Sequence, residues 1–374
     1  TAEVRLEHFW IPNDHISLTS GLDFIGGGYE FTIDLPFSFE NAANFDPLAE
    51  RDPVQLKGSG FGCGPDVYVN AQINPLKNID RWRLDIGFRN SFARLTEDGN
   101  SQVLLSSFGF DPRFASRLQV TESTVFKNAI GIYTQPPQPF EMWRPEGSTE
   151  LGFERATSAE VGIEQQLPFD SRLDVSLFGK KLDRLVVQNT TAADATDLFY
   201  TNEGIGRVYG LEGILRKAPT GKFFGWVSYT LSRSERNDYP TKNQDLDVDV
   251  IPGSPESGDW YIFDLDQTHI LVAVAGYNFP LDFGFSGKIQ YVTGNPFTPY
   301  AGGVYDIDQD TYFAFPSGNY NSERLPPFYA LDLRIDKLFT FKKWQMELYT
   351  DFLNVVKGDN PEVTLYNYDY TESR

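Results

Sequence analysis

Two short acidic stretches each place an aspartate at every second position. The aspartates are Asp245, Asp247 and Asp249 in the first stretch, and Asp306, Asp308 and Asp310 in the second. In an extended strand, residues two apart point to one face, so the carboxylates of each stretch would lie together. Clustered oxygens are calcium ligands, but neither stretch has the glycine and distal glutamate of an EF-hand loop. Calcium, a cationic ligand and plain solvation all fit; we predict no metal site and keep these aspartates as candidate ligand-binding residues.

Aromatic side chains accompany the second acidic stretch. Tyr305 and Tyr312 flank it and offer flat surfaces to a sugar or an aromatic ligand, although they could equally pack the loop against itself. Trp143 lies in a proline-rich segment at 136–145, which is either a loop anchor or a ligand contact. We add these three residues to the candidate ligand-binding set.

The residues needed for several other chemistries are scarce. The chain has one cysteine, Cys63, and three histidines, so cysteine-based zinc sites and multi-histidine centres are not expected. The glycine-rich residues 58–64 lack the Lys-Ser/Thr of a phosphate loop, and we interpret them as a flexible loop. No Ser/His/acid spacing typical of hydrolases occurs. We therefore predict a protein that is not an enzyme and has no cofactor.

The composition is acidic and aromatic. Across 374 residues, 52 Asp and Glu outnumber 32 Lys and Arg, and the formal charge of -20 argues against nucleic acid as a partner. Aromatic residues make up 15%, which suits a pleated sheet.

Apolar residues alternate with polar ones along most of the chain. In residues 329–336, Leu331, Leu333 and Ile335 alternate with charged side chains, and similar stretches run through 82–88, 173–177, 208–215, 270–277 and 283–291. We predict about fifteen strands of roughly ten residues each, the length that crosses a bilayer at a tilt.

The connections between these strands alternate in length. Short ones are expected near residues 74–80, 121–124, 167–170, 218–221, 279–282 and 340–342, and long ones at 135–157, 189–206, 234–268 and 294–327. This alternation is typical of an antiparallel transmembrane β-barrel meander with short periplasmic turns and long extracellular loops. A soluble propeller or sandwich would also show one apolar and one polar face.

Several stretches resemble the barrel of TonB-dependent outer-membrane receptors. Residues 149–164 are similar to a loop ending in Leu-x-x-Glu that enters a strand Glu-x-Gly-x-Glu, here Leu151, Glu154, Glu160, Gly162 and Glu164. Residues 202–216 resemble the Asn-x-Gly…Gly-x-Glu strand through Asn202, Gly204, Gly210 and Glu212. Residues 173–187, 263–271, 291–300 and 352–362 also look similar, so the resemblance covers residue 66 to the end.

The resemblance implies an all-β fold in which the motif residues are structural. It implies a receptor/transporter in the outer membrane of a Gram-negative bacterium that binds a scarce nutrient through its loops and lumen. Its partners would be outer-membrane lipid, a small nutrient ligand, and an inner-membrane energy-coupling complex acting on a plug domain. We find no plug and fewer strands than the family's barrel of about 22. We therefore expect residues 1–374 to be the C-terminal part of one barrel, truncated at both ends.

Two alternatives remain open at this point. One is a structural or adhesion barrel of the outer membrane that transports nothing. The other is a soluble all-β carbohydrate-binding protein, in which the apolar rows would be buried between packed layers.

Overall fold

Strand pairing dominates the computed structural model of the chain. The structure describes residues 2–35, 54–76, 81–97, 103–142, 151–188, 200–238, 258–307, 311–358, 360–361 and 363–373. The main sheet is formed by β1 (Ala2–Asn13), β2 (Ile16–Leu35), β3 (Val54–Ile73), β4 (Trp82–Glu97), β5 (Val103–Gln119), β6 (Thr124–Gln135), β7 (Glu154–Leu167), β8 (Ser171–Gln188), β9 (Tyr200–Lys217), β10 (Phe223–Asn237), β12 (His269–Phe279), β13 (Phe283–Val292), β18 (Phe328–Thr340) and β19 (Gln345–Phe352).

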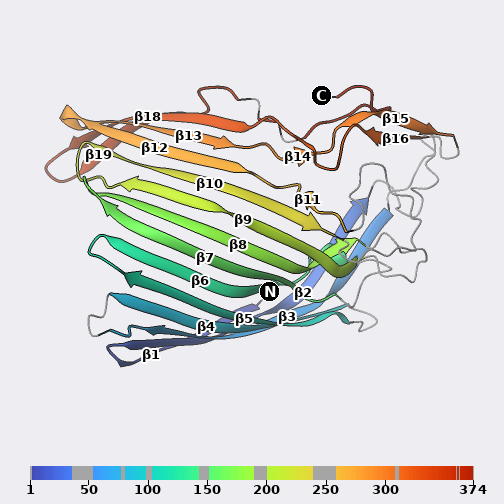
Figure 1. Cartoon of the computed structure of the whole chain (residues 1–374), viewed down its shortest axis with the longest axis horizontal. Coiled ribbons are helices and arrows are strands. Elements are labelled where there is room, and N and C mark those ends of the chain that lie inside the picture. Colours follow the sequence, from blue (N-terminus) through green and yellow to red (C-terminus); the bar gives the residue numbers. More distant parts are fainter. Residues whose placement is uncertain are drawn as a thin grey trace.

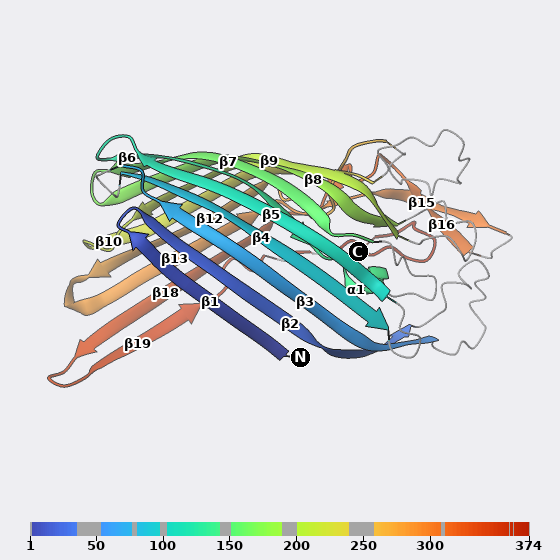
Figure 2. The same cartoon turned by 90° about the horizontal axis from the view of Figure 1, so that it is seen from below.

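The sheet is an antiparallel meander in which neighbours in sequence are neighbours in space. The order is β1 to β10, then β12, β13, β18 and β19, with the short β11 (Tyr261–Ile262) pairing beside β10. The strands are tilted and the sheet curls as a single layer, with β1 and β19 as its two edges (Figures 1 and 2). The expected all-β antiparallel meander is therefore confirmed, as an open part of a barrel.

The two ends of the sheet differ, as the connection lengths predict. At one end the chain turns back tightly, for example at the 3-10 turn η2 (Pro280–Asp282) between β12 and β13. The opposite end carries the long connections and two small hairpin-like pairs, β14 (Pro296–Phe297) with β17 (Glu323–Arg324), and β15 (Tyr300–Asp306) with β16 (Thr311–Pro316) (Figure 1). We call the end with the tight turns the turn end, and the end with the long connections the loop end.

The pairing register divides the sheet into a polar and an apolar face. On β7 and β8, Ile163 pairs with Val175 and Val161 with Leu177, while Glu164 pairs with Asp174 on the other face. Ile163 and Leu177 are 51% and 55% exposed. We call the apolar side the outer face and the polar side the inner face.

Few apolar side chains are buried in the part of the chain that the structure describes. A small cluster of Leu105, Met142, Leu151 and Phe153 lies at the loop end, where the short helix α1 (Pro139–Met142) contributes Met142. By contrast, apolar side chains on every strand of the main sheet are largely exposed. Exposed apolar surface of this extent indicates contact with a membrane or a protein partner. It does not fit the two packed layers of a soluble sandwich.

Some local expectations are wrong. Residues 58–64 are not a flexible loop, because they belong to β3 and pair with β2 from Ile25 to Phe31. The glycines leave room for a cross-strand ring: a Cβ on Gly60 would lie 2.2 Å from the Tyr29 hydroxyl, which donates to the Thr96 carbonyl at 2.8 Å. Strands such as β2 and β3, at 20 residues, also exceed the expected ten.

No helix in the described ranges is long and apolar enough to cross a membrane.

Candidate ligand-binding surface

The inner face of β1–β4 is lined by charged pairs that reach across strands. Arg5 binds Asp23 on the adjacent strand, with Nε 2.7 Å from Oδ1. Arg89 on β4 pairs with Asp66 on β3 and also lies 3.5 Å from Asp23 on β2. The Tyr68 hydroxyl donates to Glu7 on β1 at 2.7 Å. Contacts that skip a strand require converging side chains, which identifies this polar face as the concave one.

The same arrangement continues across β5–β8. Glu164 on β7 accepts from Arg117 on β5 at 3.0 Å and lies 3.4 Å from Arg172 on β8. Lys127 on β6 reaches Asp174 on β8, with Nζ 2.6 Å from Oδ1. The inner face is therefore a continuous wall of paired charges that can contact a polar ligand or water.

A hollow of about 710 Å³ lies against β1–β6. Its polar lining includes Ser17, Asn70, Gln72, Asp85 and Arg113. These groups offer hydroxyl, amide and charged contacts along the wall, and the volume falls within the range of small-molecule sites.

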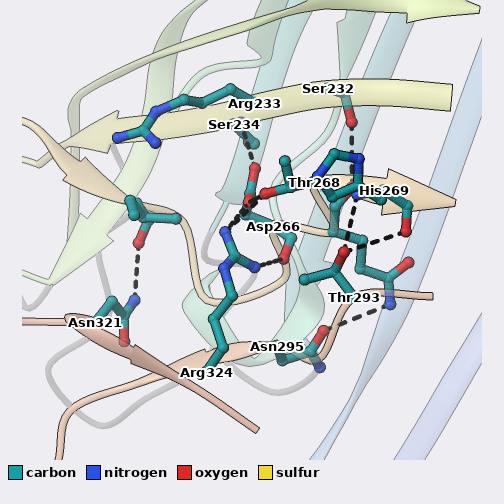
Figure 3. A network of polar contacts seen from close by, with 12 residues as sticks. Ser232, Arg233, Ser234, Asp266, Thr268, His269, Thr293, Asn295, Asn321 and Arg324 are labelled. Carbon is teal, nitrogen blue, oxygen red and sulfur yellow. Dashed lines mark hydrogen bonds and ion pairs between the residues drawn. The ribbon is translucent and has the colours of Figure 1, made fainter. Parts of the chain in front are cut away.

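Asp266 is the centre of a polar cluster at the loop end (Figure 3). Its side chain is 1% exposed, and Arg324 Nη2 lies 2.5 Å from Oδ2. Thr268 Oγ1 also donates to Oδ2 at 3.0 Å, and the Ser234 amide donates to Oδ1 at 2.6 Å. Arg324 further donates to the carbonyls of Asp266 and Gly294 at 2.8 and 3.1 Å. The cluster joins the β10–β12 and β13–β18 connections to the sheet.

A second group of polar and aromatic side chains lies beside the Asp266 cluster and links the same two connections. Asn321 donates through Nδ2 to the Ile262 carbonyl at 2.8 Å and also bonds Asp264 Oδ1, which accepts the Tyr320 hydroxyl at 3.2 Å. The rings of Tyr320 and Tyr261 meet edge to face, with centroids 5.0 Å apart. These contacts hold both long connections against each other.

Burial raises the pKa of several side chains at this junction of the loop end. Desolvation raises the pKa of Tyr261 and Tyr320, so both hydroxyls remain hydrogen-bond donors near neutral pH. Desolvation also raises the pKa of Asp238, although the hydrogen bond that Asp238 Oδ2 accepts from Tyr261 at 2.7 Å acts in the opposite direction.

The structure brings two of the predicted ligand-binding residues together on one hairpin. Tyr305 on β15 pairs with Tyr312 on β16, and their ring centroids are 5.1 Å apart. Tyr312 also meets Tyr368 edge to face at 5.7 Å. Tyr305 and Tyr368 are 48% and 80% exposed, so this aromatic surface is open to a ligand.

Among the other predicted ligand-binding residues, the structure describes the backbone of Asp306 alone. Asp306 ends β15 and pairs with Thr311. Trp143, Asp245, Asp247, Asp249, Asp308 and Asp310 lie outside the residues that the structure describes.

The motif residues before β7 and on β9 hold the loop end together. Leu151 is buried in the cluster with Leu105, Met142 and Phe153. Asn202 Oδ1 accepts from the Gly152 amide at 2.6 Å, while its Nδ2 donates to the Arg184 carbonyl at 2.9 Å. Glu154 Oε1 accepts from the Val186 amide at 3.0 Å.

The motif residues within the strands occupy the inner face. In register, Gly162 opposes Ser176, Ser176 opposes Glu212, and Phe178 opposes both Glu160 and Gly210. A Cβ on Gly162 would lie 2.6 Å from Ser176 Oγ, and one on Gly210 would lie 2.8 Å from the Phe178 ring. These glycines therefore leave room for side chains of β8 on the concave side.

Sequence reasoning missed the Asp266 cluster. From the sequence, residues 263–271 are only a stretch similar to the family. His269 begins β12, with Nδ1 2.9 Å from the Tyr229 hydroxyl. The partner of Asp266, however, lies 58 residues further along the chain, and no local signal identifies Arg324.

Comparison with known proteins gives a family match. The family model described as "TonB dependent receptor-like, beta-barrel" matches residues 5–355, a longer part of the chain than the motifs cover. No curated protein matches the chain significantly.

Solved structures of outer-membrane receptors share the fold. The FrpB iron transporter from Neisseria meningitidis is 17% identical over 88% of this chain and 47% of its own, with a TM-score of 0.59. The ferric-catecholate import receptor Fiu from E. coli is 14% identical over 99% and 52%, with a TM-score of 0.62. The ferripyoverdine receptor of Pseudomonas aeruginosa is 13% identical over 99% and 46%, with a TM-score of 0.64. The chain spans about half the length of these receptors.

Proposed function

Because this chain belongs to the TonB-dependent receptor-like β-barrel family, whose members reside in the Gram-negative outer membrane, we propose that it is the wall of a nutrient receptor there. The loop end and the inner face would bind a scarce nutrient from outside the cell. Uptake would be driven by an inner-membrane energy-coupling complex acting through a plug domain within the barrel. The process would be binding and gated passage without covalent chemistry.

The division of the sheet into two faces carries this proposal. Apolar side chains such as Ile163 and Leu177 are exposed on the outer face, while paired charges such as Arg117 and Glu164 line the inner face. A transmembrane β-barrel requires this combination, because hydrocarbon surrounds it and water or ligand fills it. The family and the structural neighbours are receptors and transporters, which supports a role in transport and not in catalysis.

We place a ferric chelate first among the candidate nutrients. Three neighbours are named as an iron transporter, a ferric-catecholate import receptor and a ferripyoverdine receptor. The exposed rings of Tyr305 and Tyr368 at the loop end could stack on an aromatic chelator. A vitamin, a sugar or a peptide are the other nutrient classes to be tested beside it.

Uptake by whole cells tests the proposal. Cells carrying the gene, cells lacking it, and cells lacking the energy-coupling complex are supplied with iron-55 complexed to a panel of siderophores, and with labelled vitamins, sugars and peptides. We expect at least one compound to accumulate only when both the gene and the complex are present. Equal uptake by all three strains across the panel would overturn the transport function.

Aromatic variants connect the uptake to the loop end. Exchanging both Tyr305 and Tyr312 for Ala should weaken binding of the transported compound at least about fivefold, the loss of a binding contact worth roughly 1 kcal/mol. The control is Tyr277→Ala, because Tyr277 is an exposed aromatic residue of the outer face near the turn end.

A further inference from the structure

Lys337 is a cation on the apolar outer face. It pairs in register with Phe283 on β13 and with Leu348 on β19. Phe283 and Leu348 are 45% and 66% exposed. The next outward residues on the same strand, Ile335 and Phe339, are also apolar.

Lys337 is held by aromatic rings and has no carboxylate partner among the residues that the structure describes. Its Nζ lies 4.5 Å from the ring centroid of Phe283 and 5.5 Å from that of Phe339. In the described ranges, no carboxylate oxygen lies within 4.0 Å of Lys337 Nζ, which is the distance limit for an ion pair. The neighbouring acid Asp336 pairs with Gly284 on the inner face. Within the described part of the chain, the ammonium therefore lacks a counter-charge.

The height of Lys337 on the barrel follows from the register. Phe283 is the first residue of β13, directly after the η2 turn, so Lys337 lies level with the turn end. In the next turn, Phe341 and Trp344 stack with centroids 4.0 Å apart, and Trp344 is 55% exposed. Exposed tryptophan marks the interface between membrane and water.

A lysine at this height is tolerated, and a partner for its charge near the interface would stabilise it. A lysine on the lipid face costs about 2–4 kcal/mol at the bilayer midplane but about 0–1 kcal/mol near the interface. Its aliphatic part can lie on apolar surface while the ammonium reaches the headgroups. Lys342 and Lys343 add two exposed cations in the adjacent turn.

We infer that Lys337, Lys342 and Lys343 form a binding site for the phosphate headgroup of an anionic phospholipid at the turn end of the barrel. The acyl chains would lie along the outer surface of Phe283, Phe339 and Leu348. The site rests on the proposed membrane location of the chain, but not on the identity of its nutrient.

Lipid retention measures this site directly. The protein is embedded in nanodiscs containing equal amounts of phosphatidylglycerol and phosphatidylcholine, and co-purifying lipid is counted by native mass spectrometry after gentle detergent extraction. We expect Lys337→Met to reduce the preference for phosphatidylglycerol about fivefold, which corresponds to the roughly 1 kcal/mol that one lysine contributes near an anionic surface. Lys337→Arg should retain the preference.

Lys217 offers a matched control at the same end of the sheet. Its Nζ is already bonded to the Ala218 carbonyl at 3.0 Å and to Thr220 Oγ1 at 3.1 Å. Lys217→Met should therefore leave the lipid preference unchanged. Equal losses for both variants would show a diffuse charge effect, and no loss for Lys337→Met would show no site; either outcome overturns the inference.

The assay also separates this inference from the proposed function. It uses no nutrient and no energy-coupling complex, so failed uptake leaves the lipid result standing. Failure of the protein to enter either lipid would instead refute the proposed membrane location.

Discussion

The Asp266 cluster and the inner-face wall use the same kinds of residue in opposite surroundings. At the loop end, the side chains of Asp266 and Arg324 are 1% and 26% exposed. On the wall, those of Arg334 and Glu347 are 37% and 51% exposed, although the pair is 3.0 Å apart. Water can replace a lost partner on the wall but not around Asp266. The cluster therefore holds structure together, whereas the wall presents charge to the lumen.

Removing the arginine from each pair should give the largest difference between the cluster and the wall. Arg324→Met leaves the Asp266 carboxylate buried without its cation, so the free energy of unfolding should fall by about 3–5 kcal/mol. Arg334→Met should cost less than about 1 kcal/mol, because its partners are exposed. Urea titration of the lipid-reconstituted protein measures both values. Similar losses in the two variants would show that burial does not distinguish the pairs.

Glycine substitutions test where the wall itself is tightly packed. A Cβ on Gly210 would lie 2.3 Å from the Leu231 carbonyl oxygen, whereas one on Gly179 has no neighbour within 4 Å. Gly210→Ala should therefore reduce the free energy of unfolding by about 1–3 kcal/mol, the usual effect of overpacking. Gly179→Ala, on the outer face, should change it by less than about 0.5 kcal/mol. The same urea titration tests the pair, and equal effects would contradict the packing argument.

A smaller, pH-dependent effect is expected beside the Asp266 cluster. Burial raises the pKa of Asp238 above its ordinary value of 3.8, so the folded loop end favours the protonated acid. The stabilisation is complete below pH 3.8 and is lost as the pH rises through the raised pKa. Local unfolding of the loop end, followed by hydrogen exchange of residues 258–268, should become easier over this window.

The matched variant is Asp238→Asn, which has no carboxyl to titrate. Its local stability should be less dependent on pH in this window, while that of the parent protein falls. An unchanged pH profile in the variant would assign the effect to another group.

Much of the fold could be predicted from the sequence, because strand alternation and turn chemistry are local. The alternating residues 270–277 and 283–291 become β12 and β13, joined at the predicted short turn. The alternating stretches named from the sequence leave out β1 and β2, and in β2 glycines interrupt the alternation around Gly26–Gly28. The glycine-rich start of β3 was misread for the same reason, because glycine suits a loop as well as a crowded strand.

The candidate site was predictable only in part. Tyr305 and Tyr312 were predicted as ligand-binding residues because they flank the second acidic stretch. The β15–β16 hairpin places them opposite each other. The Asp266 cluster was not found, because its members come from the end of β10, from the connection before β12 and from β17. The position of Lys337 on the apolar outer face was likewise not predicted, because only the register places Phe283 and Leu348 beside it.

The sequence by itself determined which side chains share a face and which connections are long, because a period of two and the choice of turn residues act over a few neighbouring positions. The curvature of the folded sheet sets which face is concave and which charges meet. Arg324 reaches Asp266 across 58 residues, and Lys127 reaches Asp174 across 47. Such contacts depend on how a curved sheet brings distant strands together, and no local pattern encodes that distance.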